Sequence, residues 1–198
     1  MKAVMCEVPE HLLAWRKKTD GDQWDEMWEG VLHMPPMPSR GHQELEGALE
    51  SWLRQHWARP LGNKVYHNVN LVRAGGWPSD YRGPDLLLLT PGRFYTDKDV
   101  YFEGAPDCVV EIESPYDESR DKMEWYARLG VPDMWIIDRD SKQPELYSLV
   151  EGAYQPRAPD PQGWLTSALG MQFRCRTPGR LEIRMSTAPD TTLEELPN

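Results

Sequence analysis

Apolar positions along the chain change their period several times, and this pattern predicts helices alternating with strands. Between residues 42 and 57, apolar side chains recur at helical spacing on one face. That face consists of Leu45, Ala48, Leu49, Trp52 and Leu53. Residues 9–18 predict a shorter helix that has its proline at the start. Residues 117–129 predict a further helix that ends at Gly130.

Short apolar runs predict the strands. Segment 85–89 is apolar after its first residue, which is typical of a central strand buried on both faces. Segment 107–114 alternates and should place Val109, Glu111 and Glu113 on one side and Cys108, Val110 and Ile112 on the other. Further strands are predicted at 24–34 with a break at Gly30, and at 64–73, 134–138, 146–150, 154–157 and 181–185.

The order of these elements indicates the fold class. A strand, a helix and a second strand across residues 107–138 suggest a βαβ-like unit, so we expect an α/β or α+β protein. A chain of 198 residues has the length of one domain with a substantial core. We place this domain at residues 1–187 and expect a polar, frayed C-terminal tail at 188–198.

The net charge of −10 changes the functional expectation. A strongly basic chain would suggest nucleic-acid binding, and this chain is acidic. An acidic nuclease is still possible, because metal ions and a local basic patch can contact the phosphates. The charge therefore counts against nucleic acid as a partner without excluding it.

The cysteines and the apolar runs bear on location. Cys6, Cys108 and Cys175 lie far apart and form no CxxC pair, which argues against a disulfide scaffold and for a reducing compartment. The first nine residues lack the long apolar stretch of a signal peptide. The apolar run at 86–89 is too short to cross a bilayer. We therefore expect a cytoplasmic protein with no membrane partner.

Two carboxylates and one lysine carry the chemical prediction. Asp85 and Glu111 belong to apolar strands, where a charge is costly unless something pairs with it. Carboxylates suit a hard divalent cation, and a lysine can orient water or stabilise charge on a phosphate. Lys122 starts the helical stripe that continues through Trp125, Tyr126 and Leu129, so it should face the sheet. The set indicates a magnesium-dependent phosphodiester-cleaving enzyme.

Each of these residues also has a simpler interpretation. Lys122 could be a surface lysine that pairs with Glu118 one helical turn earlier. Glu111 and Glu113 could line the solvated face of an edge strand. Gly-Pro-Asp before a strand is an ordinary turn signal, which would account for Asp85. The sequence alone leaves these alternatives open.

The predicted helix at 42–57 adds two polar positions on or beside its apolar stripe. His42 lies one turn before Leu45 and could assist the site, or it could be a hydrogen-bonded core histidine. Glu46 and Glu50 repel each other at i, i+4, so both are expected in solvent. The chain has no GxxxxGK[ST], GxGxxG, HExxH or GxSxG motif, and its cysteines and histidines lack zinc-site spacing.

Residues 104–115 and 122–138 resemble the core motifs of the Uma-two family of restriction-endonuclease-like proteins, within the PD-(D/E)xK nuclease superfamily. Glu29-Gly30, the proline-rich loop after it and His42-Gln43 are also similar to that family. The resemblance covers roughly residues 10–185. It implies a restriction-endonuclease-like mixed central sheet flanked by helices, which here carries additional short strands.

The resemblance also implies roles for individual residues. Pro84-Asp85 matches the PD element, Glu111 the second acid, and Lys122 a catalytic lysine that has migrated from the strand to the next helix. Mg²⁺ or Mn²⁺ would be held by Asp85, Glu111 and the backbone carbonyl of Ile112. Accessory roles are implied for Glu113, His42 and Glu29. Val31 departs from the family pattern, which commonly has an acid there, and the loop before Lys122 is shorter than usual.

Three functions follow as hypotheses. The first is a metal-dependent endonuclease acting on DNA, and the resemblance suggests a homodimer. The second is a non-catalytic binding or assembly module on the same scaffold, because a fold does not fix a function. The third is a glycosidase that uses Glu111 and Asp85, against which the nearby lysine and the lack of an evident sugar platform argue.

Overall fold

The structure is a computed structural model that describes residues 3–5, 9–19 and 22–197. Cys6 lies outside the described residues, whereas Cys108 and Cys175 are both free thiols. No helix in the described part of the chain is long and apolar enough to cross a membrane.

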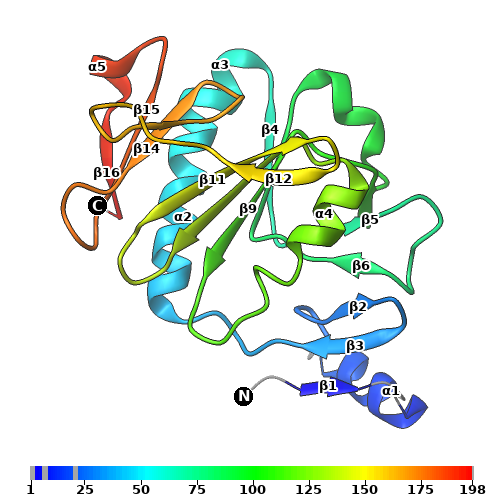
Figure 1. Cartoon of the computed structure of the whole chain (residues 1–198). Helices are drawn as coiled ribbons and strands as arrows, with labels where there is room; N and C mark the ends of the chain where they lie inside the picture. The colour runs from blue at the N-terminus through cyan, green and yellow to red at the C-terminus, as the bar shows by residue number, and fades with distance from the viewer. Residues whose placement is uncertain (1–2, 6–8, 20–21, 198) are drawn as a thin grey trace.

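A six-stranded central sheet organises the molecule, with strand order β12-β11-β10-β9-β7-β4 (Figure 1). Its strands are β4 (Lys64–His67), β7 (Leu86–Leu89), β9 (Cys108–Glu113), β10 (Asp133–Asp138), β11 (Pro144–Val150) and β12 (Ala153–Pro156). β9 and β10 run parallel and are joined through α4 (Met123–Leu129), which is the expected βαβ unit. The other neighbouring pairs are antiparallel, so the sheet is mixed.

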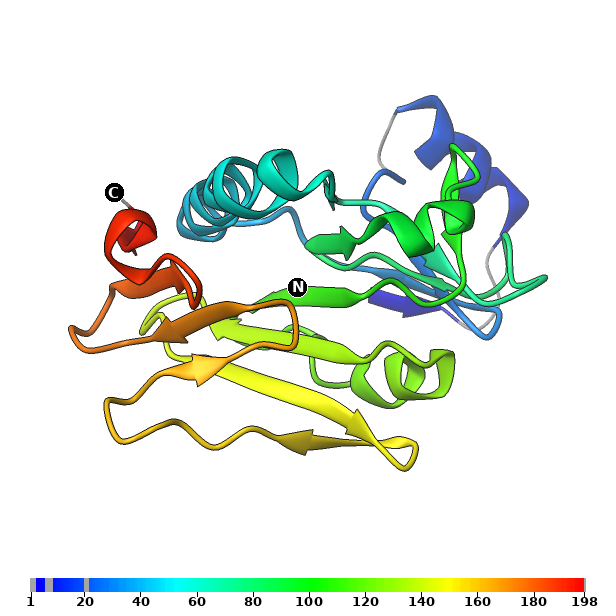
Figure 2. The ribbon, with the colours of Figure 1, turned by 90° about the horizontal axis from the view of Figure 1, so that it is seen from above.

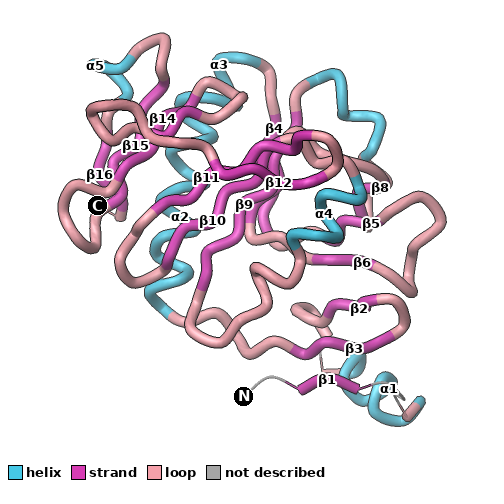
Figure 3. The backbone as a smooth tube through the Cα atoms, viewed as in Figure 1, coloured by secondary structure: helices cyan, strands magenta, loops and turns pink. Residues whose placement is uncertain are grey.

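A second six-stranded sheet and a four-stranded sheet flank the central one (Figure 3). The N-terminal sheet has the order β1-β3-β2-β6-β5-β8, with β1 (Ala3–Met5), β2 (Glu26–Trp28), β3 (Val31–Met34), β5 (Asn70–Val72), β6 (Tyr81–Arg82) and β8 (Tyr101–Glu103). The C-terminal sheet contains β13 (Leu165–Thr166), β14 (Met171–Arg174), β15 (Leu181–Met185) and β16 (Glu194–Leu196). The predicted break at Gly30 is confirmed as the turn between β2 and β3.

Helices cover both faces of the central sheet. Ser39 caps α2 (Arg40–Leu53), which continues into a π-helical turn (Arg54–Ala58) and α3 (Arg59–Leu61). The remaining helical segments are α1 (Glu10–Lys18), the 3₁₀ turn Pro91–Thr96 and α5 (Pro189–Thr192). α2 and α4 lie on opposite sides of β9 (Figure 2).

The alternation predicted for residues 107–114 is confirmed. Cys108, Val110 and Ile112 pack with Leu45 and Leu49 of α2 and with the C-terminal sheet. On the opposite face, Val109 packs with Trp125 and Tyr126 of α4. From Cys108 to Ile112, β9 is therefore buried on both faces, and the charge of Glu111 requires a partner inside the protein.

The predicted strand at 64–73 is in fact two strands in two sheets. Asn68 has a left-handed backbone with φ of 49°, which interrupts the extended chain between β4 and β5. β4 pairs with β7 in the central sheet, whereas β5 pairs with β6 and β8. The chain thus crosses between sheets at Asn68 and Val69.

Two helical or tail predictions also require correction. α4 begins at Met123 and not at 117, because the Asp117 carboxylate accepts the backbone N–H groups of Ser114 and Ser119 and holds this segment in turns. The C-terminal tail is not frayed within residues 189–196, since it forms α5 and β16. Leu196 is 1% exposed, and Thr192 Oγ1 accepts the N–H of Met185 at 2.8 Å. The domain limit at 187 stays a prediction.

Candidate active site

Asp85 directly precedes β7, at the end of the strands where the ladder between β7 and β9 stops. Its Oδ2 accepts the backbone N–H of Ile112 at 2.6 Å and so replaces a strand carbonyl. Its Oδ1 lies 3.0 Å from Nε2 of His42 on α2. Because a strand N–H lies in the plane of the sheet, Asp85 is held in this plane beside Glu111. The Gly-Pro-Asp segment is therefore more than a local turn, because its aspartate connects β9 to α2.

Glu111 and Lys122 are buried and hydrogen-bonded to each other on the α4 side of β9. Glu111 is 2% exposed, and its Oε2 lies 3.3 Å from Nζ of Lys122. The hydroxyl of Tyr126 donates to the other carboxylate oxygen at 2.6 Å. The alternatives of a solvated edge strand and a surface lysine are thus wrong, and the lysine points toward the sheet as its stripe predicts.

A second carboxylate holds the lysine from the N-terminal sheet. Glu26 of β2 lies 2.8 Å from Nζ of Lys122, and the same amine donates to the Gly83 carbonyl at 3.0 Å. Glu26 also accepts the indole N–H of Trp28 at 2.6 Å. These contacts fix the position of the amine between two sheets.

Burial dominates the electrostatics of this pair. It raises the pKa of Glu111 to about 8, against the opposing effect of Lys122 and with a further increase from the charge of Asp85. Burial lowers the pKa of Lys122, but the carboxylates of Glu111, Glu26 and Asp85 more than offset this and raise it overall. Lys122 is therefore a permanent cation beside a carboxyl that titrates near neutral pH.

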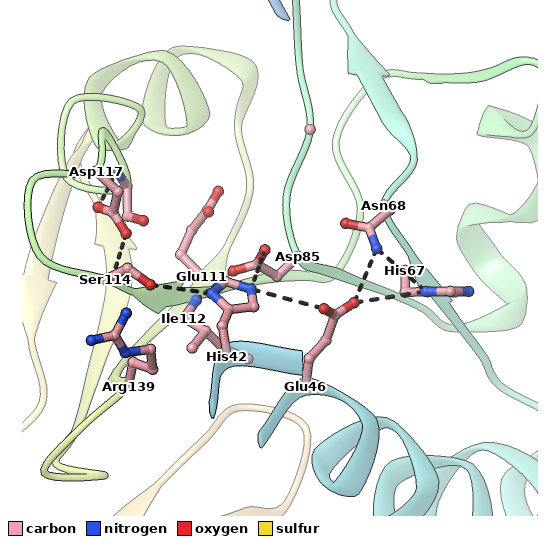
Figure 4. Close-up of polar contacts among 12 residues, drawn as sticks. His42, Glu46, His67, Asn68, Asp85, Glu111, Ile112, Ser114, Asp117 and Arg139 are labelled. Carbon is pink, nitrogen blue, oxygen red and sulfur yellow. Dashed lines mark hydrogen bonds and ion pairs between the residues drawn. The ribbon is translucent and has the colours of Figure 1, made fainter. Parts of the chain in front are cut away.

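α2 contributes a histidine and a carboxylate (Figure 4). His42 bridges Asp85 and Ser114, with 3.3 Å between its Nδ1 and the Ser114 hydroxyl oxygen. Glu46 Oε2 lies 3.8 Å from His42 Nε2, and its other oxygen accepts from Asn68 at 3.2 Å. His42, Glu46 and Asp85 each offer an atom within 4.8 Å of the others.

The expectation that Glu46 is solvated is wrong, because it is 6% exposed. Glu46 accepts a hydrogen bond from Asn68, whereas Glu50 pairs with Arg54. Burial and the charge of Asp85 raise the pKa of Glu46 to about 7. The pKa of His42 is lowered by burial but raised overall by its hydrogen bond to Asp85.

Glu26, His42, Asp85, Glu111 and Lys122 line one cavity of about 570 Å³, whereas Glu46 and Tyr126 are not among its lining residues. Its walls come from the β2–β3 hairpin, the proline-rich loop, the start of α2 and the loop between β9 and α4. Its acidic side chains are Asp25, Glu26, Asp85, Glu111, Asp117 and Glu118, and its lysine and arginine are Lys122 and Arg139. Carboxylates thus outnumber these two cations, as a site built to hold a cation requires.

Two predicted accessory residues point elsewhere. Glu113 shares a strand face with Glu111 but pairs with Arg120, whose Nε lies 2.5 Å from its Oε1. Glu29 lies at the exposed hairpin turn, and neither residue lines the cavity. The structure therefore gathers Asp85, Glu111, Ile112, Lys122 and His42, and leaves Glu113 and Glu29 outside.

Sequence reasoning missed Glu26, Glu46 and Arg139. Glu26 belongs to a three-residue strand with no clear alternation, so nothing local marks it as buried. Glu46 lies beside the apolar stripe of α2, and its place next to that stripe was the available signal. Arg139 directly follows β10 and reaches Ser39 at 3.3 Å, a contact between residues 100 positions apart.

A mixed sheet that presents two carboxylates and a buried lysine to one cavity defines a nuclease-like α/β protein. A family model described as "Uma2: Putative restriction endonuclease" matches residues 9–178. The chain belongs to this Uma2 family, as its sequence motifs predict.

A solved structure supports the fold assignment. The chain is similar to a crystal structure described as a putative nuclease belonging to DUF820 from Anabaena variabilis ATCC 29413, with a TM-score of 0.55 and 17% sequence identity. The match covers 70% of this chain and 82% of that chain. The predicted restriction-endonuclease-like fold is thus confirmed. No curated protein matches the chain.

Proposed function

We propose that this protein is a divalent-metal-dependent endonuclease that hydrolyses phosphodiester bonds of DNA. The observation that carries the proposal is the buried Glu111–Lys122 pair beside Asp85 in one cavity. Burying such charges away from water costs free energy, so their presence in a cavity points to a role in binding a ligand or cation. The family membership supports a nuclease, and the remaining detail rests on the chemistry of the cavity.

The side chains present fit a divalent cation. Asp85, Glu111 and the Ile112 carbonyl offer the oxygen donors that Mg²⁺ and Mn²⁺ prefer. Burial raises the pKa of Glu111 and of Glu46, and the negative charge of Asp85 raises both further, so a bound cation would relieve this repulsion. When bound, the cation would act as a Lewis acid on the phosphate.

The chain's own groups would position the reacting atoms. Lys122 keeps its proton and is held by Glu26 and Glu111, so its positive charge would stabilise the negative charge of a phosphate bound beside it. Tyr126 fixes the Glu111 carboxylate through its hydroxyl. His42 orients Asp85 from the opposite side. Cytoplasmic location and a homodimer remain predictions from the sequence.

Cleavage by the purified protein tests this function. Supercoiled plasmid and labelled oligonucleotides would be incubated with Mg²⁺, Mn²⁺ or EDTA. We expect cutting by the wild type only with metal, and loss of at least 100-fold of the rate in Lys122→Met, since removing one charge-stabilising donor costs about 10²–10³ in rate. Lys98→Met, at an exposed lysine outside the cavity, is the matched control.

The competing function is a non-catalytic binding module on the same fold. It predicts nucleic-acid or protein binding with no metal-dependent cutting at any substrate or metal concentration. Cutting that is equal in wild type and Lys122→Met would show a contaminant or a different mechanism.

A further inference from the structure

Tyr116 has an unusual place at the rim of the candidate active site. Tyr116 is 96% exposed, and it lines the same cavity as Asp85, Glu111 and Lys122. Across residues 3–5, 9–19 and 22–197, neither its ring nor its hydroxyl has a partner. A large aromatic side chain is thus presented to solvent at the mouth of the site with no contribution to the core.

The backbone makes this placement unfavourable for the fold. Ser114 to Asp117 form a turn closed by a 3.2 Å hydrogen bond from the Asp117 N–H to the Ser114 carbonyl. Pro115 occupies the second position and Tyr116 the third, where φ is 67°. A type II turn has this pattern and favours glycine or asparagine at its third position. The chain therefore carries a tyrosine where a small residue would fit with less strain.

The turn is also fixed relative to the reacting groups. The Asp117 carboxylate accepts the N–H groups of Ser114 and Ser119, which braces the turn from inside. The Ser114 hydroxyl contacts His42, and His42 contacts Asp85. The ring is thus displayed on a rigid support that leads directly to the candidate metal site.

We propose that Tyr116 is a stacking platform for an unpaired nucleobase, and that this nuclease prefers single-stranded nucleic acid to a continuous duplex. The inference rests on the proposed function. Bases within a duplex hide their faces in the helical stack, so a solitary exposed aromatic ring can stack only on a base that is unpaired or displaced.

The charge and size of the cavity favour the same substrate. Six acidic side chains line the cavity with Lys122 and Arg139, and even with Asp25 paired to Arg16 the acids leave little attraction for a phosphate backbone in the absence of metal. Contact with a base face then becomes a larger share of the affinity. A volume of about 570 Å³ matches pockets that enclose a small ligand of nucleotide size, and not a groove that follows a double helix.

Binding in EDTA tests the inference separately from cleavage. Fluorescence anisotropy would compare a labelled single-stranded 20-mer, as DNA and as RNA, with the corresponding DNA duplex. For single strands we expect about a 10-fold weaker Kd in Tyr116→Gly and little change in Tyr116→Phe, because one stacked base commonly contributes that much. The DNA and RNA arms tell which sugar the site accepts.

Controls make the stacking contact specific. Tyr95→Ala removes a comparably exposed tyrosine, 72% exposed, that does not line the cavity, and should leave binding unchanged. A single-stranded oligonucleotide with one 2-aminopurine should show quenched fluorescence with wild type and Tyr116→Phe, and recover it with Tyr116→Gly.

The inference is overturned if Tyr116→Gly binds single strands as well as wild type does, if it loses duplex binding equally, or if the wild type binds neither form. Cleavage fails or succeeds independently of this result. A wild type that cuts duplex DNA without regard to Tyr116 would retain the nuclease function and refute the stacking role.

Discussion

Metal binding should tighten as the pH rises, and this follows from the burial of Glu111. The perturbation is a change from pH 6 to pH 9 in a titration of the wild-type protein with Mn²⁺. A carboxyl must lose its proton to bind a metal, and burial raises the pKa of Glu111 to about 8. Protons and Mn²⁺ therefore compete for this side chain across the neutral range.

The magnitude follows from that pKa. At pH 7, a carboxyl with a pKa near 8 carries its proton in about nine of ten molecules. Binding at pH 7 should release close to one proton, and Kd should fall nearly 10-fold between pH 6 and pH 7. The dependence should flatten above pH 8. Glu46, with a pKa of about 7, and His42, with a raised pKa, act in the same direction, since both lose their protons as the pH rises.

Isothermal titration calorimetry in two buffers of different ionisation enthalpy counts the released protons directly. Glu111→Gln should bind Mn²⁺ more weakly and release about one proton fewer at pH 7. Glu124→Gln is a suitable control, because its side chain is 82% exposed on α4. A Kd that is equal at pH 6 and pH 9, or an unchanged proton count in Glu111→Gln, would refute the assignment of Glu111 as a ligand.

Three other predictions concern stability. In EDTA, the contribution of Glu111 to the free energy of unfolding is fully present below its unfolded pKa of 4.5 and is lost as the pH rises through about 8. The melting temperature should therefore fall between these pH values, and it should fall less in Glu111→Gln. Lys122→Met should lower the free energy of unfolding in urea by about 3–5 kcal/mol, because it leaves buried carboxylates without their cation; a change below 1 kcal/mol would contradict the buried pair. Tyr116→Gly should raise the free energy of unfolding by up to about 1 kcal/mol by removing left-handed strain, and a lower melting temperature than wild type would show that the ring supports the fold.

The central strand and its charges could be predicted because their signals are local. Alternation across 107–114 identified both faces of β9, and helical spacing placed Lys122 toward the sheet. An apolar run with one acid is informative, since a buried charge must be paired. These two elements together carry most of the candidate site.

The parts of the fold and of the candidate site that could not be predicted depend on contacts between residues far apart in the sequence. Glu26 contacts Lys122, which lies 96 positions later in the chain. A three-residue strand is too short to show a pattern that would predict this contact. The switch of sheets at Asn68 depends on one left-handed residue inside an otherwise strand-like sequence. The order of the tail depends on Leu196, which is buried where β16 pairs with β15 in the C-terminal sheet. Tertiary packing decides such cases over local preference.

The link from Glu26 through Lys122 to Glu111 has a consequence for when this chain can act. Glu26 belongs to the N-terminal sheet and Glu111 to the central sheet, so their shared amine is held on both sides only after the two sheets have docked. A nascent chain, a proteolytic fragment or a partly unfolded molecule would carry Asp85, Glu111 and Lys122 and still lack the brace. Under the proposed function, cutting would therefore require both sheets to be folded and docked, because only then is the Lys122 amine held from both sides.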